Sequence, residues 1–428
     1  MPHLWKRLGA ALRRDFERIW RAGVVHIGVS QWISRFVFVA QRILLARILK
    51  ADGIGHISVV SATLNLVRLP AGGGIFTALT KLMAESARDP EKERSVMGTA
   101  LSINLATSVV ISLATAFILS RTSWVPDPVA NSILRRMVPF LPVLILSESF
   151  RCALLGQRRM RVAGAAMTTA AVASLLLVTL AAWRWNLAGW TTAQIASFFL
   201  ALVCVMIPLR SVLSVRWDSA SARRLAGIGV FAFLGQMSGQ LILQFDTLAI
   251  SGLLQDPETT GIYNTAALVA QQLLVVPGAI LTVAFPMVAQ NRDDPARLRS
   301  SYREVTRKLA LLSVAVSLVA VFAADPLFGL MGARFLKSLR PFRVLLLGFV
   351  ARSLYILDNT YLDALGRTDL TFASGLFAAL ATIGLNLWLI PRWGLMGAAW
   401  ATTSAMFISL ALRRATVYLF IFRWRAVR

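Results

Sequence analysis

Nine charged side chains lie inside the long apolar stretches of this 428-residue chain, and their types suggest what those stretches enclose. The first half of the chain holds Arg35, Arg42, Arg68, Glu148 and Arg151, and the second half holds Asp246, Arg352, Asp358 and Asp363. A charge at the middle of a lipid-facing helix costs roughly 2.5–3.5 kcal/mol on insertion scales. These positions therefore predict a polar interior in which charges are hydrated or paired.

The surplus of arginine in the first half predicts a binding site for an anion. A guanidinium group holds phosphate oxygens in pairs, so we assign a phosphate or pyrophosphate to four side chains. These are Arg35, Arg42, Arg68 and Arg151. Two alternatives stay open: Arg42 could anchor its helix at the outer membrane surface, and Glu148 and Arg151, three residues apart, could neutralise each other.

Amide side chains and acids dominate the corresponding stretches of the second half. With Gln31, which shares a helix face with Arg35 and Arg42, we expect seven polar residues to line a cavity suited to hydroxyl-rich substrates. They are Gln31, Gln240, Gln244, Asn264, Gln271, Arg352 and Asn359. The alternative is hydrogen bonding between helices. Glu148, Asp246 and Asp358 are candidate sites for a coupling proton or sodium ion, and the second half is expected to carry net negative charge.

Composition places the chain in a membrane. It is 57% hydrophobic, with a mean hydropathy of +0.66 and a formal charge of +25. The basic residues lie in short loops beside apolar runs, which indicates a multi-pass membrane protein with both termini in the cytoplasm rather than a nucleic-acid partner. Two cysteines and three widely separated histidines predict no metal site.

We expect this chain neither to hydrolyse ATP nor to catalyse another reaction. A phosphate-binding loop of the ATPase type is absent, since Gly-Lys does not occur, and no loop is long enough to hold a catalytic domain. We therefore expect no enzyme and no cofactor. Any active transport must draw on a gradient, with H+ or Na+ as the coupling ion.

Twelve apolar runs are long enough to span a membrane. They predict an all-α protein in which residues 23–209 form one six-helix lobe and residues 226–428 form a second, around a central cavity. Residues 210–225 are the cytoplasmic linker, and residues 1–22 predict an amphipathic helix on the membrane surface. The glycines at 72–74, and Pro277 with Gly278, indicate bends or hinges.

The two halves share short sequence matches, which predict a duplication of six helices. Residues 154–158 match 364–367, 139–140 match 341–342, and 55–57 match 261–263. Because the repeat contains an even number of helices, the halves would have the same orientation.

Three segments resemble a known family of transporters. Residues 74–85 (GIFTALTKLMAE) resemble the end of the second helix in polysaccharide-transporter flippases. Residues 246–250 (DTLAI), 261–266 (GIYNTA) and Pro286 resemble their seventh and eighth helices, and 386–391 (NLWLIP), Gly394 and 397–399 (GAA) resemble their last hairpin. The chain is therefore similar to the multidrug/oligosaccharidyl-lipid/polysaccharide exporter superfamily.

That resemblance implies two lobes around a cavity that opens alternately to either side of the membrane. It implies a monomeric flippase for undecaprenyl-pyrophosphate-linked oligosaccharides in O-antigen, capsule or exopolysaccharide synthesis, working beside glycosyltransferases and a glycan polymerase. Two other readings stay open: a cation-coupled multidrug antiporter, and a membrane glycan polymerase or ligase, which would need a sizeable outer loop.

Overall fold

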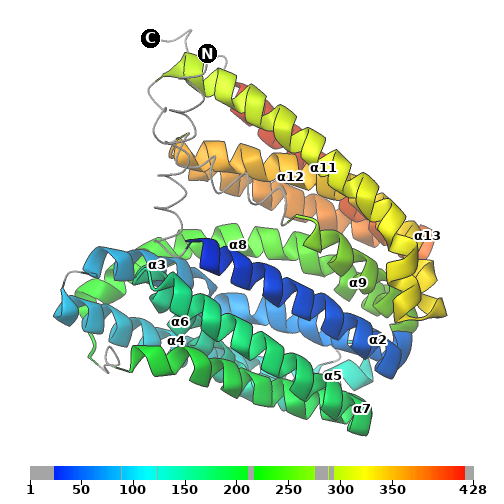
Figure 1. The fold of residues 1–428 in the computed structure, drawn as a ribbon, viewed down its shortest axis with the longest axis horizontal. Helices are drawn as coiled ribbons and strands as arrows, with labels where there is room; N and C mark the ends of the chain where they lie inside the picture. Colours follow the sequence, from blue (N-terminus) through cyan, green and yellow to red (C-terminus); the bar gives the residue numbers. More distant parts are fainter. Residues whose placement is uncertain are drawn as a thin grey trace, which may run out of the picture. The chain divides into compact units, whose positions relative to one another are not determined.

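The computed structural model describes residues 24–87, 89–122, 124–210, 216–274, 288 and 294–419. The predicted amphipathic segment 1–22, the bend at Pro277 and Gly278, and part of the linker 210–225 lie outside these residues. Within them the chain is helical and contains no strand, so the all-α prediction is confirmed (Figure 1).

The α-helices are longer than the predicted spans, and short irregular helices join some of them. In order they are α2 (Val24–Arg68), α3 (Gly74–Ser86), α4 (Pro90–Arg121), α5 (Pro128–Met137), α6 (Leu141–Gly156), α7 (Met160–Met206), α8 (Ser219–Leu254), α9 (Pro257–Gln272), α11 (Pro295–Met331), α12 (Leu339–Ala364) and α13 (Thr368–Val417). The irregular elements are η1 (Leu69–Gly73), η2 (Val138–Phe140), η3 (Ile207–Leu209) and η4 (Ala333–Ser338).

Six helical stretches of the described chain are long and apolar enough to cross a membrane. Two of them contain a turn: α7 leaves helical geometry at Trp185 and Asn186, and α13 does so at Gly394. At both turns a small residue allows close packing, because a Cβ on Gly189 or Gly397 would lie about 2 Å from a carbonyl oxygen of the preceding helix. Each stretch is therefore a helical hairpin, as the paired apolar runs predict. The count of twelve spans stays a prediction.

Aspartate followed by proline begins four of the helices. Asp89, Asp127, Asp256 and Asp294 each accept hydrogen bonds from backbone N–H groups of the turn that follows. The carboxylate satisfies N–H groups that lack helical partners, and proline at the first helical position loses no hydrogen bond. The local sequence thus fixes where α4, α5, α9 and α11 begin.

The chain forms two compact units. The first contains residues 1–48, 67–122 and 133–233, and the second contains 49–66, 123–132 and 234–428. Segments 49–66 and 123–132, which we assigned to the first lobe, thus group with the second unit. The predicted division of the chain into two lobes and a linker stays a prediction.

Each unit has its own apolar core. In the first, α3, α4 and α6 meet around Leu79, Met83, Met97 and Leu154, all at most 1% exposed. In the second, α11 and α12 meet around Tyr302, Leu357 and Tyr361, and the two tyrosine rings lie edge to face with centroids 5.0 Å apart. These cores hold in place the helices that carry the buried charges.

The backbone turns repeat along the chain and support the predicted duplication. Left-handed residues occur at Lys50, Arg158 and Asn186, and again at Gln255, Gly366 and Gly394. The members of each pair are 205, 208 and 208 residues apart. Turn geometry is therefore repeated even where the residue type is not.

A close crossing of two helices inside the second unit joins matching positions of the two halves. A Cβ on Gly55 would lie 1.9 Å from the carbonyl oxygen of Pro257, and one on Gly261 would lie 2.2 Å from that of Ala51. Nearby, the Ser58 hydroxyl donates to Asn264 Oδ1 at 2.9 Å. The repeat relates the first two contacts to each other, because Gly261 and Pro257 each lie 206 positions after Gly55 and Ala51, and Ser58 and Asn264 are themselves 206 positions apart. The glycines are required here because the backbones touch.

Candidate functional site

Arg68 lies in the first unit, at the point where α2 ends in an irregular turn. The α-helical hydrogen bonding of α2 gives way to a π-helical turn, η1, whose sequence is LPAGG. The Ala71 carbonyl there accepts a hydrogen bond from the Thr107 hydroxyl at 2.6 Å, so the irregular turn is supported from α4. The glycines at 72–74 thus lie at an irregular turn, where the bend stays a prediction, and π-helical turns are frequent at functional sites.

Arg68 lies at the start of this turn and is partly buried. Within the described chain it donates no hydrogen bond, and it lies within electrostatic range of Glu148 and Arg151 on α6. The structure therefore brings three of the predicted charged residues together.

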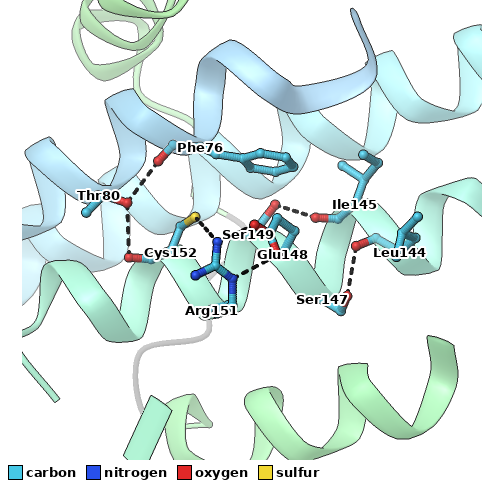
Figure 2. Close-up of polar contacts among 9 residues, drawn as sticks. All are labelled: Phe76, Thr80, Leu144, Ile145, Ser147, Glu148, Ser149, Arg151 and Cys152. Carbon is cyan, nitrogen blue, oxygen red and sulfur yellow. Dashed lines mark hydrogen bonds and ion pairs between the residues drawn. The ribbon is translucent and has the colours of Figure 1, made fainter. Parts of the chain in front are cut away.

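Glu148 and Arg151 form a two-pronged ion pair, shown in Figure 2. Arg151 Nε donates to Glu148 Oε2 at 2.9 Å, and Arg151 Nη2 donates to Oε1. Their side chains remain 28% and 35% exposed, so the pair is reachable from outside the protein interior. Mutual neutralisation, the alternative left open above, is therefore what the structure shows for these two residues. Because Glu148 and Arg151 neutralise each other, the positive charge of Arg68 is not balanced within this group of three residues.

Packing between α3 and α6 holds this pair in place. The Thr80 hydroxyl donates to the carbonyl oxygens of Phe76 and Cys152 at 3.0 and 3.4 Å (Figure 2). A Cβ on Gly156 would lie 2.7 Å from the Thr80 carbonyl oxygen, so α6 lies directly against α3. Ser149 accepts a hydrogen bond from Asn104 at 2.8 Å, which ties α6 to α4.

The other predicted anion ligands lie earlier on α2. Gln31 and Arg35 are exposed, whereas Arg42 is 8% exposed. Burial of Arg42 argues against its alternative role as an anchor at the membrane surface. The contacts of Arg68, Glu148 and Arg151 that the structure describes do not include Arg35 or Arg42.

Asp246 on α8 is the centre of a buried polar network in the second unit. It is 3% exposed, and its Oδ2 accepts hydrogen bonds from the hydroxyls of Tyr263 and Thr402 at 2.6 and 3.3 Å. Oδ1 accepts the backbone N–H of Thr247 at 2.7 Å. In the part of the chain that is described, no cationic side chain pairs with this carboxyl group. Its donors in the described chain are therefore neutral, namely hydroxyl groups and one backbone N–H.

Asp358 on α12 is also buried, but it has a cationic partner. It is fully buried; Tyr302 donates to its Oδ1 at 2.6 Å and Arg414 Nε donates to its Oδ2 at 3.1 Å. Arg414 is also within 5.2 Å of the Tyr302 ring centroid. This cluster links α11, α12 and α13.

Sequence reasoning missed Arg413 and Arg414 as buried or partly buried charges of the last helix. Both lie within α13, and Arg413 is 4% exposed. The second half thus has three arginines beside its three aspartates, and the expected net negative charge is wrong. Tyr263, Tyr302 and Thr402 were also missed, since a hydroxyl in an apolar helix gives no charge signal.

The amide side chains show mixed roles. Asn264 donates to the Thr247 hydroxyl at 3.1 Å and accepts from Ser58, which is the interhelical bonding considered as an alternative. Gln244 donates to Gln240 at 3.5 Å along α8. Gln271, Arg352 and Asn359 are partly buried. Their proposed contact with sugars stays a prediction.

A histidine and an aspartate pair at the N-terminal end of α5, outside the apolar spans. His56 Nδ1 lies 2.5 Å from Asp127 Oδ2. Burial alone would raise the pKa of Asp127, but hydrogen bonds from His56 and from the backbone N–H groups of Ala130 and Val129 hold that pKa below its usual value. The described residues contain no group of three potential metal ligands.

Comparison with known proteins identifies the family. A model of the family described as "Polysaccharide biosynthesis protein" matches residues 44–340. The chain belongs to this family. Stage V sporulation protein B of Bacillus subtilis is 24% identical over 436 residues, covering 92% of this chain and 83% of the relative. The probable flippase AglR of Haloferax volcanii is 26% identical over 213 residues, covering 47% of this chain and 44% of AglR.

Solved structures confirm the fold. An inward-facing multidrug resistance MATE family transporter of the MOP superfamily matches with a TM-score of 0.77 at 13% identity, covering 95% of this chain and 99% of that chain. The lipid II flippase MurJ in an inward closed conformation matches with a TM-score of 0.74 at 12% identity, covering 92% and 87%. At these identities the likeness establishes the fold alone.

Proposed function

We propose that this polysaccharide biosynthesis family member is a flippase for a lipid-linked oligosaccharide. It would move an undecaprenyl-pyrophosphate-linked glycan from the cytoplasmic to the periplasmic leaflet of a bacterial inner membrane by alternating access. The protein acts as a monomer with cytoplasmic termini, and supplies a glycan polymerase with substrate made by glycosyltransferases. It performs transport and no covalent chemistry.

The observation that carries this proposal is the environment of Arg68. Its guanidinium donates no hydrogen bond to the described residues, and it lies at a π-helical break beside a half-exposed ion pair. A phosphate group can accept several of these donors at once, whereas a cationic drug would be repelled. The family supplies the rest of the argument, since its members are polysaccharide biosynthesis proteins.

The Glu148–Arg151 pair adds selectivity to such a site. Glu148 holds two guanidinium nitrogens of Arg151 and leaves Nη1 without a carboxylate partner. A pyrophosphate that reaches Arg68 can then accept from Arg151 Nη1, while Glu148 limits the total positive charge. We propose that Arg35 and Arg42 contact the anion at other stages of its passage.

Asp246 is the proposed coupling residue. A carboxyl group surrounded by hydroxyl donors and without a cationic partner can be neutral when protonated at little structural cost, because Tyr263 and Thr402 can still hydrogen-bond to it. Asp358 is a less suitable coupling residue because its ion pair with Arg414 favours the ionised carboxylate. We propose proton coupling through Asp246, with sodium as the alternative ion.

Replacement of Arg68 tests the proposal in cells. Arg68→Ala is expected to reduce export of the surface glycan at least 10-fold, roughly the value of a charge-assisted hydrogen bond. Arg68→Lys should retain part of the activity, since it keeps the charge but loses the planar fork. Arg121→Ala, an exposed arginine at the end of α4, is the matched control.

The amount of each variant in the membrane must be measured alongside glycan export. Full export by a normally inserted Arg68→Ala protein would contradict the proposal. Loss of drug resistance without any loss of glycan would instead favour a multidrug antiporter.

A further inference from the structure

Two arginines of the second unit converge on one buried tyrosine ring. The guanidinium carbon of Arg413 lies 4.6 Å from the ring centroid of Tyr355, and that of Arg352 lies 5.9 Å from the same centroid. Arg413 is 4% exposed and Tyr355 is 5% exposed. The ring attracts each cation, but the arrangement also holds two like charges close together in the interior.

Two guanidinium nitrogens of each arginine lack an acceptor in the described chain. Nε and Nη1 of Arg352, and Nε and Nη1 of Arg413, are buried and donate to no described residue. Buried donors are normally satisfied, and a guanidinium has no neutral form to adopt instead. Four such nitrogens on two neighbouring side chains therefore point to a missing acceptor with several oxygens.

The nearby acids do not supply that acceptor. Asp358 already accepts from Tyr302 on one oxygen and from Arg414 on the other. Asp363 lies within electrostatic range of Arg413, but no ion pair joins them in the described chain. Positive charge thus exceeds negative charge around Tyr355.

A glycine leaves room beside the Arg413 guanidinium. A Cβ on Gly375 would lie 3.3 Å from Arg413 Nη2 and 3.4 Å from Ser238 Cβ. The Arg413 fork therefore reaches toward the first half of α13 and α8, where the Ser238 hydroxyl offers a further polar group. Any larger residue at 375 would crowd this space.

We infer that Arg352 and Arg413, with Tyr355 between them, form a second anion site that binds a phosphate group. This site is separate from the one at Arg68, and its assignment to phosphate rests on the proposed function. The phosphate belongs either to a lipid headgroup or to a free pyrophosphate. Both present several oxygens to two planar donor forks, which is the geometry that arginine recognises best.

Titration of the purified full chain with inorganic pyrophosphate tests this inference. The protein is placed in nanodiscs of phosphatidylcholine, and binding is followed by calorimetry. Arg352→Gln and Arg413→Gln should each weaken the binding about 10-fold or more, since each removes charge-assisted hydrogen bonds. Arg392→Gln, which replaces an exposed arginine in the first arm of the α13 hairpin, should bind like the wild type.

A second set of nanodiscs containing phosphatidylglycerol distinguishes the source of the phosphate. If lipid headgroups occupy the site, pyrophosphate binding to the wild type weakens in these discs, and the weakening disappears in Arg413→Gln. If a free pyrophosphate is the ligand, both types of disc give the same affinity. Either result supports the site.

Unchanged pyrophosphate affinity in folded Arg352→Gln and Arg413→Gln proteins would overturn the inference. If Arg413→Gln does not fold, pyrophosphate affinity is measured in Arg413→Lys and Arg352→Gln instead. Lysine keeps the positive charge but lacks the planar guanidinium group, so Arg413→Lys should also bind more weakly. Arg68→Ala separates this inference from the proposed function: that variant should lose glycan translocation but keep the binding that depends on Arg413. Normal translocation by Arg68→Ala would contradict the flippase site without affecting the second one.

Discussion

The charged side chains of the two units differ in their exposure and in their hydrogen-bond partners. In the first, Glu148 and Arg151 pair at a half-exposed position beside Arg68, whose donors have no acceptor among the described residues. In the second, Asp246 and Asp358 are almost completely buried, and each accepts a tyrosine hydroxyl at 2.6 Å. The same residue types thus occur in an accessible setting and in a closed one.

This difference separates an accessible ion pair from carboxylates that belong to the internal structure. An accessible guanidinium can bind and release an anion at modest cost, because water solvates it in the empty state. A buried carboxylate must keep its partners or change its protonation state. Asp358 is paired with the cation Arg414, whereas the described donors to Asp246 are all neutral, so we expect only Asp246 to change protonation during transport.

Removal of the cation beside Asp358 should have the largest effect on stability. The Arg414 side chain is 34% exposed, but Arg414→Gln leaves the fully buried Asp358 carboxylate with a hydrogen bond from Tyr302 alone, and removal of the cation beside a buried carboxylate costs about 3 kcal/mol. Thermal unfolding in detergent should show a clearly lower transition. Arg392→Gln is the control, and an unchanged transition in Arg414→Gln would show that Asp358 does not depend on this pair.

Asp127→Ala should have a smaller effect, of about 1–2 kcal/mol, because it removes the N-cap of α5 and the contact with His56. The pKa of Asp127 is held below its usual value, so its contribution to stability is fully present above the unfolded pKa and is lost as the pH falls through the lower, folded one. The difference between wild type and variant should therefore shrink on acidification below about pH 4. A difference independent of pH would contradict the ionised pairing.

Loss of the half-exposed carboxylate should cost less still. Glu148→Gln is expected to lower stability by about 1 kcal/mol or less, since water can solvate Arg151 in its place. The comparison between the two units predicts this contrast with Arg414→Gln. Equal destabilisation by the two variants, measured by thermal unfolding, would remove the distinction between accessible and closed charges.

Among these variants, Asp246→Asn should have the smallest effect on stability. It should abolish coupling to the proton gradient without abolishing substrate movement. Asparagine keeps the shape and still accepts from Tyr263 and Thr402, but it cannot take up a proton. Translocation of the lipid-linked oligosaccharide that is driven by a pH gradient should be lost. Exchange of this substrate between leaflets that hold equal concentrations of it should continue. If gradient-driven transport persists in Asp246→Asn, Asp246 is not the coupling residue.

The helical membrane fold and the repeat could be predicted from the sequence, because charges and glycines are rare in apolar runs and mark their ends and interiors, whereas the anion-binding role of Arg68 stays a prediction. The sequence could not show the π-helical turn at residues 69–73, which depends on support from Thr107. It also could not separate Asp246 from Asp358, because their partners come from distant helices. Arg413 and Arg414 were missed since they lie near the end of α13, where basic residues normally belong to the cytoplasmic tail.

Translocation in proteoliposomes tests the central claim most directly. Purified protein is reconstituted with a fluorescent polyprenyl-pyrophosphate-linked oligosaccharide, and the fraction accessible to an added quencher is followed over time. The wild type should move the lipid between leaflets, and Arg68→Ala should not, while Arg121→Ala behaves as the wild type. Translocation by Arg68→Ala at the wild-type rate, or none above protein-free liposomes by the wild type, would contradict the account.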